Sequence, residues 1–360
     1  MKQSLLTRIF PPPEALIFTS MSLDISDQSI KFAELKQTVG GLKLKRFGTI
    51  PVPPGIMSAG KIQDSKKLIT LLSDIKQKQK IHYVRVALPE EQLYLFNIRI
   101  PQADVKELRN MVELQLEEHI PIKASEAVFD YAILDDHNDG YDLEVSAMSA
   151  FVVETYSSVF IQAGLVPLSF ELEAQAIARA IVRRGDGATY MIVDFGETRT
   201  GISIVTKNVV VFATTLDLGG YGLTKAIEKS LNISFEKAEE LKRAEGLSRN
   251  PEHKELFGAL LQSISVLRDE ISKNLIYWQT HKDDEGKDRP KIDEILFCGG
   301  NANLIGLSEY LSASLRMKVA LANPWVNIAS GDSYVPQMTS REAIGYVTAL
   351  GLALGDFEYD

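Results

Sequence analysis

The chain has 360 residues, of which 24% are charged, and a formal net charge of −9. This acidic balance argues against a nucleic-acid-binding protein, because such proteins usually present a basic surface. The single cysteine, Cys298, excludes an intramolecular disulfide, and the five histidines are too scattered to predict a zinc site.

Residues 1–15 read as an N-terminal tail, which we expect to be flexible. Prolines at positions 11–13 interrupt this tail before the long apolar core of a signal peptide could form. No run of the sequence is apolar over the length needed to cross a bilayer, so we predict no transmembrane segment. These features together predict a cytoplasmic protein.

Strand patterns begin at residue 15 and predict a three-stranded meander. The expected strands span residues 15–25, 29–36 and 42–53. Residues 64–79 then carry apolar side chains at helical spacing, and Asp64 or Ser65 can cap that helix. Residues 83–90 predict a buried strand.

The next part of the chain, residues 94–168, has an order of its own. A strand is followed by a helix, two strands around the turn at 135–140, a second helix that ends at Gly164, and a last strand. This β-α-β-β-α-β order can close as a two-layer unit of ferredoxin-like size. We therefore expect an inserted α/β subdomain at residues 94–168.

The second half of the chain repeats the plan of the first. A helix at residues 171–185 leads into a second meander that begins near residue 189. Helices follow, then a strand, a glycine turn and a helix, and finally one more helix. These segments span 222–231, 234–246, 255–280, 291–315 and 341–355.

The two meanders match when Asp24 is set on Asp194. Each has an apolar strand, the aspartate, one apolar residue, a small residue and an acidic residue, followed by a polar turn and another strand. Such a repeat predicts a duplicated fold whose two lobes aim both turns into one cleft. The first lobe is expected at 16–93, 169–188 and 338–360, and the second at 189–337.

Both turns have the chemistry of an anion site. Backbone N–H groups in a tight turn form a nest, and the hydroxyls of Ser29, Thr198 and Thr200 can add hydrogen bonds to a phosphate. Asp24 and Asp194 would repel phosphate unless a hard cation lies between. Mg²⁺ held through its water shell by the two carboxylates meets that need.

Two further segments could hold the rest of a nucleotide. In "FCGGNANLIG" a glycine turn follows a buried strand, and a helix expected to begin near Leu304 would aim its N-terminus at a phosphate or ribose. Glu239 and Lys242 are three residues apart on a predicted helix, so they share a face and could bracket a ribose or a base edge. A surface ion pair is the alternative for these two residues.

The order of these motifs resembles the actin-like ATPase superfamily, an α/β fold of two duplicated, ribonuclease H-like lobes. Within it the chain looks most like the PilM family of type IV pilus assembly, and next most like the cell-division protein FtsA. The resemblance covers nearly the whole chain from Leu16 on. It is carried by "LDISDQSIKFAEL", "IRIPQADVKELRNMVELQLEEHIPI", "VDFGETRTGISIV", "LGGYGLTKAI", "FEKAEELK" and "ILFCGGNANLIGLSEYL".

This resemblance implies roles for single residues. It assigns phosphate contacts in the first loop to Ser26, Asp27, Gln28 and Ser29. Lys31 falls on a lysine common in the first loops of this family, and a solvated strand lysine is the alternative for it. The second-loop contacts fall to Asp194, Gly196, Thr198 and Thr200. Ribose and base would meet Gly219, Gly220, Glu239 and Lys242, and adenosine would meet Gly299, Gly300 and Asn301. The family usually has glycine at position 26, a small neutral residue at 27 and a small residue at 301, so this chain departs from it there.

The resemblance also implies a function. Proteins of this family bind ATP with Mg²⁺ and grip a short N-terminal cytoplasmic peptide of the membrane protein PilN. They thereby link the inner-membrane platform to the pilus motor ATPases, and secretion and competence machines use similar parts. Residues 88–101 and 111–122 would line the peptide groove, which lies between the inserted subdomain and the first lobe.

Two other functions stay open at this point. An ATPase or kinase with turnover needs a residue that orients the attacking group in line with the γ-phosphate, and Glu173 and Gln175 are the candidates. A division or filament protein of the FtsA type carries a C-terminal amphipathic membrane helix. This chain ends instead in the short acidic stretch "LGLALGDFEYD", which an anionic membrane surface would repel.

Overall fold

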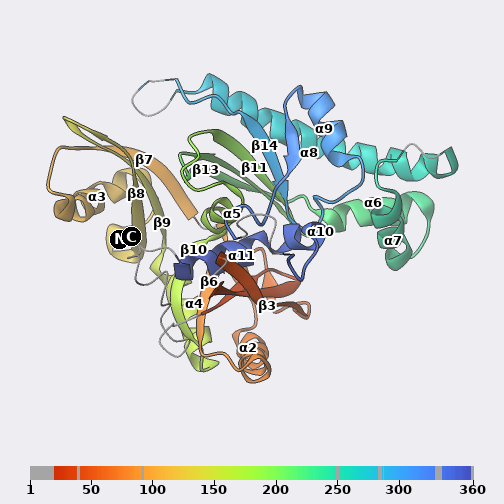
Figure 1. Ribbon diagram of the computed structural model, residues 1–360, viewed down its shortest axis with the longest axis horizontal. Helices are drawn as coiled ribbons and strands as arrows, with labels where there is room; N and C mark the ends of the chain where they lie inside the picture. The colour runs from red at the N-terminus through yellow and green to blue at the C-terminus, as the bar shows by residue number, and fades with distance from the viewer. Residues whose placement is uncertain are drawn as a thin grey trace.

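Two five-stranded sheets form the centre of the protein, as the computed structural model shows (Figure 1). The structure describes residues 20–38, 41–90, 93–248, 251–282, 286, 288–328 and 335–357. The tail predicted at 1–15 lies outside these residues. Among the described residues, no helix combines the length and the apolar character needed to cross a membrane.

The first sheet has the strand order β10-β6-β1-β2-β3. Its strands are β1 (Met21–Ile25), β2 (Ser29–Thr38), β3 (Gly41–Pro51), β6 (Tyr83–Leu88) and β10 (Val166–Leu172). The central strand β1 pairs with β2 in antiparallel fashion and with β6 in parallel fashion.

The second sheet has the same arrangement, with the order β13-β12-β11-β14-β15. Its strands are β11 (Thr189–Phe195), β12 (Thr200–Thr206), β13 (Val209–Leu216), β14 (Glu294–Cys298) and β15 (Val319–Leu321). Here β11 is central, antiparallel to β12 and parallel to β14. The two sheets therefore have one topology, as the repeat of the two meanders predicts.

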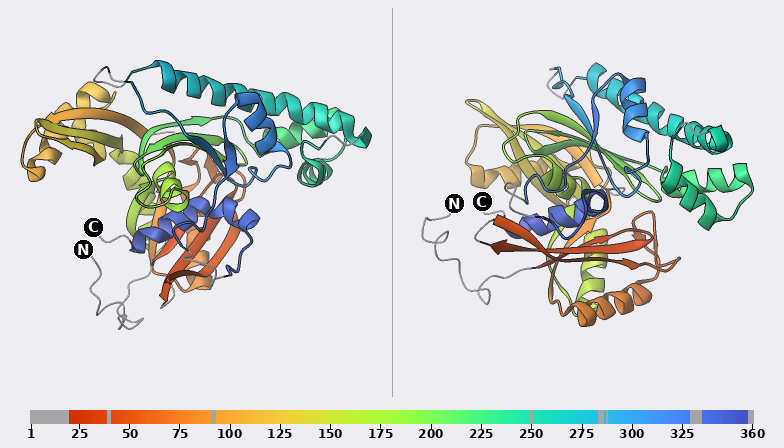
Figure 2. Two further views of the ribbon diagram at one scale, coloured as in Figure 1. Left: turned by 45° about the horizontal axis from the view of Figure 1, so that its top comes forward. Right: turned by 45° about the vertical axis from the view of Figure 1, so that its right-hand side comes forward.

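Helices cover the outer faces of both sheets (Figures 1 and 2). Buried side chains of α2 (Ser65–Gln79) and α4 (Ala150–Gln162) share a core with the first sheet. Those of α6 (Gly220–Leu231), α8 (Lys254–Thr280) and α9 (Leu307–Leu315) share a core with the second. Local sequence explains α2: Leu68, Leu72 and Ile75 form its buried face, and the Asp64 carboxylate accepts from the Lys67 amide at 3.0 Å.

A pair of helices lies between the sheets: α5 (Glu173–Ile181) and α11 (Val347–Leu354). Helix α11 contacts β1, β2 and β6 of the first sheet, and α5 contacts β12 and β13 of the second. The two helices cross at Gly351, where any side chain would clash with the Ala176 carbonyl group. The glycine thus permits the close helix contact that joins the two lobes.

The inserted part of the chain forms a smaller sheet of three strands, in the order β7-β9-β8. It comprises β7 (Leu93–Pro101), α3 (Val105–His119), β8 (Ala127–His137) and β9 (Gly140–Ser149). Leu108, Val112 and Leu116 of α3 pack on this sheet. In Figure 1 the unit stands to one side of the two main sheets.

The expected ferredoxin-like closure does not form. Strand β10 pairs with β6 in the first sheet, and Tyr156 and Phe160 of α4 belong to the core of that lobe. The apolar faces of α4 and β10 suit either partner, and only the three-dimensional packing decides between them. We therefore propose that the inserted unit ends near residue 149 rather than 168.

Two predicted helices differ in extent from the structure. The helix predicted at 171–185 is α5, which begins at Glu173 because Glu171 and Leu172 still pair with β6, and ends at Ile181. The helix predicted at 341–355 is broken into α10 (Ser340–Ala343), a 3₁₀ turn at Ile344–Tyr346 and α11.

The remaining elements are short or lie at the edge of the second lobe. Strands β4 (Met57–Ser58) and β5 (Lys61–Ile62) form a two-stranded ribbon. Helix α7 (Phe235–Glu245) packs beside α6. Three further 3₁₀ turns span Ala124–Glu126, Pro251–His253 and Gly355–Phe357.

Candidate functional site

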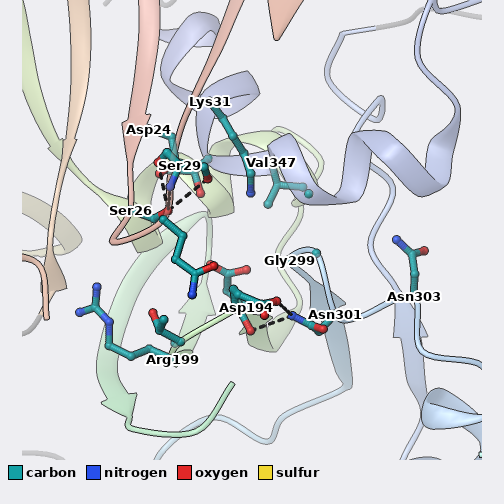
Figure 3. A pocket seen from close by; sticks show the side chains of 18 of the residues that line it. Asp24, Ser26, Ser29, Lys31, Asp194, Arg199, Gly299, Asn301, Asn303 and Val347 are labelled. Atoms are coloured by element: carbon teal, nitrogen blue, oxygen red, sulfur yellow. Dashed lines mark hydrogen bonds between the residues drawn. The ribbon is translucent and has the colours of Figure 1, made fainter. Parts of the chain in front are cut away.

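The two hairpin turns have equivalent backbone hydrogen bonds. In the β1–β2 turn the Ser26 amide donates to the Ser29 carbonyl at 2.9 Å, and in the β11–β12 turn the Gly196 amide donates to the Arg199 carbonyl at 3.0 Å. Ser29 and Arg199 thus hold matching places in the two lobes. Both turns face one cavity, together with the aspartate before each turn (Figure 3).

This cavity, which we call the interlobe cleft, has a volume of about 770 Å³. Most of the residues predicted for the site line it: Asp24, Ser26, Gln28, Ser29, Lys31, Glu173, Asp194, Gly196, Thr198, Glu239, Lys242, Gly299, Gly300 and Asn301. Five other predicted residues, Asp27, Gln175, Thr200, Gly219 and Gly220, are not among its lining residues. The two lobes therefore bring residues far apart in sequence into one site.

Four carboxyl groups lie close to one another in the cleft: Asp24, Glu90, Glu173 and Asp194. Their removal from water raises the pKa of each, to about 6 for Asp194 and about 7 for Glu90. Mutual repulsion raises the pKa of Glu173 further, through Asp24, Glu90 and Asp194. Such a cluster favours a bound cation, because a cation offsets the repulsion of the ionised groups.

Lys31 on β2 supplies a positive charge beside this cluster. It lies opposite Asp24 in the β1–β2 pair and lines the cleft. Its charge lowers the pKa of Asp24 and of Asp194, opposing the effect of burial. Lys31 therefore faces the cleft, and the alternative of a solvated strand lysine does not hold.

Asp27 serves the first turn rather than lining the cleft. Its carboxylate accepts the backbone amides of Ala59 at 3.1 Å and Gly60 at 3.3 Å, which belong to the turn of the β4–β5 ribbon. Its other neighbours are Thr198 and Arg199 from the opposite lobe. The negative charge of Asp27 is thus already engaged by four donors.

Ser26 also has a local role within its turn. Its hydroxyl donates to the Ser29 carbonyl at 3.0 Å and accepts the Ser29 amide at 3.2 Å. The hydroxyl group therefore closes the turn on itself. In the second turn Gly196 has no room for a side chain, because a Cβ atom would lie 2.8 Å from the Arg199 carbonyl oxygen.

Gly219 and Gly220 permit close packing of α6 beneath the second turn. Side chains there would clash with the Glu197 backbone and with the Asn301 side chain respectively. Asn301 in turn donates its amide group to the Gly196 carbonyl at 3.0 Å and to Glu197 Oε2 at 3.1 Å. Thr200 is fully buried, and its hydroxyl donates to the Leu218 carbonyl. These residues shape the second turn from behind.

Glu239 and Lys242 form an ion pair of 2.7 Å on α7 at the edge of the cleft. Lys242 is only 2% exposed and also donates to the Gly220 carbonyl at 3.1 Å. Glu239 further accepts from the Thr224 hydroxyl of α6. The alternative of a surface ion pair does not hold, because this pair joins α7 to the start of α6 and lines the cleft.

The helix after the glycine turn begins later than expected. Helix α9 starts at Leu307, with Gly306 in the left-handed conformation before it, and residues 299–304 form successive turns. The expected helix N-terminus near Leu304 is therefore absent from the cleft. Gly299 instead makes the close approach, because a side chain there would clash with the Asp194 carboxylate.

Several lining residues escaped the sequence analysis: Glu90, Arg199, Phe235, Arg243, Asn303 and Arg341. Glu90 ends the strand expected at 83–90 and falls in the segment predicted for the peptide groove, yet it also lines this cleft, and its carboxylate accepts the Ala174 amide at the start of α5. Arg199 lies inside a quoted motif, and its place opposite Ser29 in the repeat was the signal that could have found it. Phe235 and Asn303 lie inside the quoted motifs "FEKAEELK" and "FCGGNANLIG", whereas Arg243 and Arg341 lie outside the quoted motifs.

A second, smaller cavity adjoins the first and has a volume of about 250 Å³. We call it the insert pocket. It is lined by Glu90, Leu93, Tyr94, Leu95, Phe96, His119 and Ala213. All but Ala213 lie in the segments predicted for a peptide groove, and Ala213 belongs to β13 of the second lobe. Glu90 lines both cavities.

The β8–β9 hairpin brings together Asp135, His137 and Asp142, a grouping the sequence spacing did not suggest. Asp135 already pairs with Lys207 at 2.7 Å, and Asp142 pairs with His137 at 2.8 Å and with Arg99 at 3.2 Å. Lys207 and Arg99 therefore already form ion pairs with Asp135 and Asp142 respectively.

Comparison with known proteins agrees with this architecture. The family model described as type IV pilus assembly protein PilM matches residues 22–357. The structure titled "PilM-PilN type IV pilus biogenesis complex" superposes with a TM-score of 0.76 at 23% identity, covering 95% of this chain and 100% of that one.

Two other solved structures share the fold at lower similarity. The ethanolamine utilization protein EutJ of Carboxydothermus hydrogenoformans gives a TM-score of 0.56 at 17% identity, covering 96% of this chain and 90% of that one. MreB 5 of Spiroplasma citri, bound to AMPPNP, gives 0.55 at 15% identity, covering 88% and 94%. The expected actin-like fold is confirmed.

Proposed function

Because the chain belongs to the family of the type IV pilus assembly protein PilM, we propose that it is a nucleotide-binding scaffold of pilus assembly. It works at the inner face of the cytoplasmic membrane, holds the N-terminal peptide of a PilN-like membrane protein, and connects the membrane platform to pilus motor ATPases. The observation that carries this proposal is the convergence of both turns, with Asp24 and Asp194, on one cleft.

The cleft fits ATP with Mg²⁺ in its donor chemistry. Asp24 and Asp194 would hold the cation through its water shell, and the clustered carboxyl groups around them favour a positive charge. The turns at Ser26–Ser29 and Gly196–Arg199 offer backbone amides and hydroxyls to the phosphates. Glu239 and Lys242 stand at the ribose and base end, on α7.

The insert pocket fits an apolar peptide side chain. Its walls include Leu93, Tyr94, Leu95 and Phe96 of β7, and the Phe96 ring stacks on His119 with centroids 4.5 Å apart. The pocket is bounded by Ala213 of the second lobe, so the groove reaches further than the boundary with the first lobe. A membrane-protein peptide bound there would contact both the insert and the second lobe.

The two cavities are connected through one residue. Glu90 lines both, and its carboxylate caps the start of α5, the helix that also carries Glu173 into the interlobe cleft. Nucleotide that draws the lobes together would therefore change the width of the insert pocket. The free energy by which nucleotide shifts the equilibrium between the two lobe arrangements is limited to the difference in its binding free energy for them.

Fluorescence anisotropy of a labelled peptide tests this function. The peptide is the N-terminal cytoplasmic segment of the PilN-like protein of the same organism, measured without nucleotide, with Mg-ADP and with Mg-AMPPNP. We expect binding that changes with nucleotide and weakens about tenfold in Phe96→Ala. The matched control is Phe151→Ala, whose ring is 75% exposed on α4 away from the pocket. Equal binding of a scrambled peptide would refute the proposed partner.

An ATPase with turnover is the second candidate, and the cleft supports only a slow one. Glu173 is the better placed of the two predicted residues, since it lines the cleft and Gln175 does not. Burial, and then the neighbouring carboxyl groups, raise the pKa of Glu173 well above its ordinary value, which disfavours the ionised form that a general base needs. Phosphate release at saturating Mg-ATP, compared between the parent chain and Glu173→Gln, tests this. Sustained turnover that the substitution abolishes would favour the enzyme.

A further inference from the structure

Arg199 is a long cationic side chain at a place in the second turn where the first turn has only a serine. In the first turn the matching place belongs to Ser29, which has a short polar side chain. The Arg199 side chain is 16% exposed and lines the interlobe cleft with Ser26, Thr198 and Asp194. Figure 3 shows it on the turn below the first loop, at the end of the cleft remote from Asn303.

The guanidinium group of Arg199 reaches across to the opposite lobe. Its Nη2 lies 3.6 Å from Oδ1 of Asp27, and the neighbouring Thr198 hydroxyl donates to Oδ2 of Asp27 at 3.5 Å. Both distances are long for charge-assisted contacts, which are usually below 3 Å. By contrast, Asp27 keeps backbone donors from Ala59 and Gly60 at 3.1 and 3.3 Å. The contact across the lobes can therefore be exchanged while Asp27 stays satisfied within its own lobe.

The cations that line the cleft fall into two groups. Lys242, Arg243 and Arg341 come from α7 and α10, on the side of the ribose and base. Lys31 comes from β2 and Arg199 from the second turn, where the phosphates would lie between the lobes. Since carboxyl groups crowd this end, the outermost phosphate needs a cation besides Lys31, and a planar guanidinium can bind two of its oxygens at once.

We propose that Arg199 binds the terminal phosphate of a nucleoside triphosphate, exchanging Asp27 for it, and that this exchange makes the cleft prefer a triphosphate to a diphosphate. The inference rests on the proposed nucleotide site and adds its selectivity. A diphosphate ends one group short, so it leaves the Arg199–Asp27 pair intact. A triphosphate replaces a loose carboxylate contact with a bidentate one.

Isothermal titration of the full chain with Mg-AMPPNP and with Mg-ADP tests the exchange. In Arg199→Gln we expect the affinity for AMPPNP to fall about tenfold or more, and that for ADP by less than about threefold. Asp27→Asn removes the negative charge that competes with the terminal phosphate for Arg199. It should raise the affinity for AMPPNP severalfold and leave the affinity for ADP unchanged. The matched control, Arg243→Gln at the other end of the cleft, should change both affinities by one factor.

Equal losses for both nucleotides in Arg199→Gln would overturn the inference and leave the nucleotide site standing. Failure of the parent chain to bind either nucleotide would refute the proposed function, and this inference with it. If circular dichroism shows that Arg199→Gln does not fold, the affinities of Asp27→Asn alone test the exchange. A variant Asp27→Asn that binds AMPPNP no more tightly than the parent chain then refutes the exchange.

Discussion

Lys31 lies directly across the β1–β2 pair from Asp24, whereas Gly201 takes the same place opposite Asp194. The duplicated lobes therefore differ where their aspartates face the cleft. The first lobe supplies a positive charge beside its carboxylate, and the second supplies a glycine, near which the Glu90 carboxylate lies. A metal ion would consequently depend more on Asp194 than on Asp24.

The first prediction concerns the metal. In Asp194→Asn we expect nucleotide affinity to become insensitive to Mg²⁺, because the carboxylate that has no lysine opposite it in its strand pair is lost. Titrations with AMPPNP in Mg²⁺ and in EDTA should differ about tenfold for the parent chain and hardly at all for the variant. Asp269→Asn, on the exposed side of α8, is the control and should keep the full effect of Mg²⁺. An unchanged response in Asp194→Asn would argue that the ion binds elsewhere.

The second prediction concerns the ion pair on α7. Lys242→Met removes the partner of Glu239 and leaves the Gly220 carbonyl without its lysine donor. We expect affinity for both ADP and AMPPNP to fall about tenfold, since truncating a buried hydrogen-bonded ion pair costs several kcal/mol in typical cases. Lys237→Met, an exposed neighbour that pairs with Glu240 at 2.8 Å, should be neutral. Loss of affinity in both variants would point to a change in α7 as a whole.

The third prediction concerns pH. Glu144 on β9 is 1% exposed, and burial, with Asp130 nearby, raises its pKa to about 8. Because the folded pKa exceeds the unfolded one, the folded state binds the extra proton, and stability from this group falls as pH rises from about 4.5 to about 8. Glu144→Gln should therefore raise Tm at pH 8.5 and leave it nearly unchanged at pH 4.5.

Asn97 gives that experiment a structural rationale. It lies opposite Glu144 in the β7–β9 pair, and its Oδ1 and Glu144 Oε1 are both buried without hydrogen-bond partners in the described part of the chain. The amide of the glutamine could donate where an ionised carboxylate cannot. Thermal melts of Glu240→Gln, an exposed glutamate on α7, provide the comparison. A parallel shift of Tm at both pH values would contradict the role of ionisation.

The fourth prediction concerns the helix crossing between the lobes. Gly351→Ala puts a methyl group against the Ala176 carbonyl and forces α5 and α11 apart, so we expect a loss of about 3 kcal/mol or more in unfolding free energy. The same substitution at Gly258, on α8, meets no atom within 4 Å. It should stabilise the chain by about 0.5–1 kcal/mol, because alanine favours a helix. Urea unfolding of both variants measures the contrast, and similar values would contradict the packing argument.

Local sequence patterns predict most of the helices and strands. Helix α8, for example, was expected from apolar residues that recur at helical spacing, and these are the residues it buries: Leu260, Ile264, Leu267, Ile271 and Leu275 among them. The repeat around Asp24 and Asp194 was also readable, because a strand, an aspartate and a turn are defined by neighbours in sequence. Their meeting in one cleft follows from the duplicated topology.

Features that depend on distant partners were not readable. The apolar face of β10 fits an edge of either sheet, and only its pairing with β6 excludes it from the inserted unit. Glu90 and Arg199 line the cleft because of partners far away in sequence, Ala174 and Asp27. Asp27 itself was recognised only as a departure from the small neutral residue usual in the family, since the backbone donors of Ala59 and Gly60 that engage it come from a separate ribbon.

The tight contact between Gly351 and Ala176 limits how the molecule can move. Helices with no space between their backbones resist sliding past each other, so we expect the crossing to act as the fulcrum of any rotation of the lobes. Points far from a fulcrum travel furthest, and α2 at the lower edge and α7 at the right-hand side of Figure 1 both lie far from the crossing, on different lobes. Spin labels on these two helices should thus report rotation on nucleotide addition as a large change in separation, while a label pair on α5 and α11 stays still.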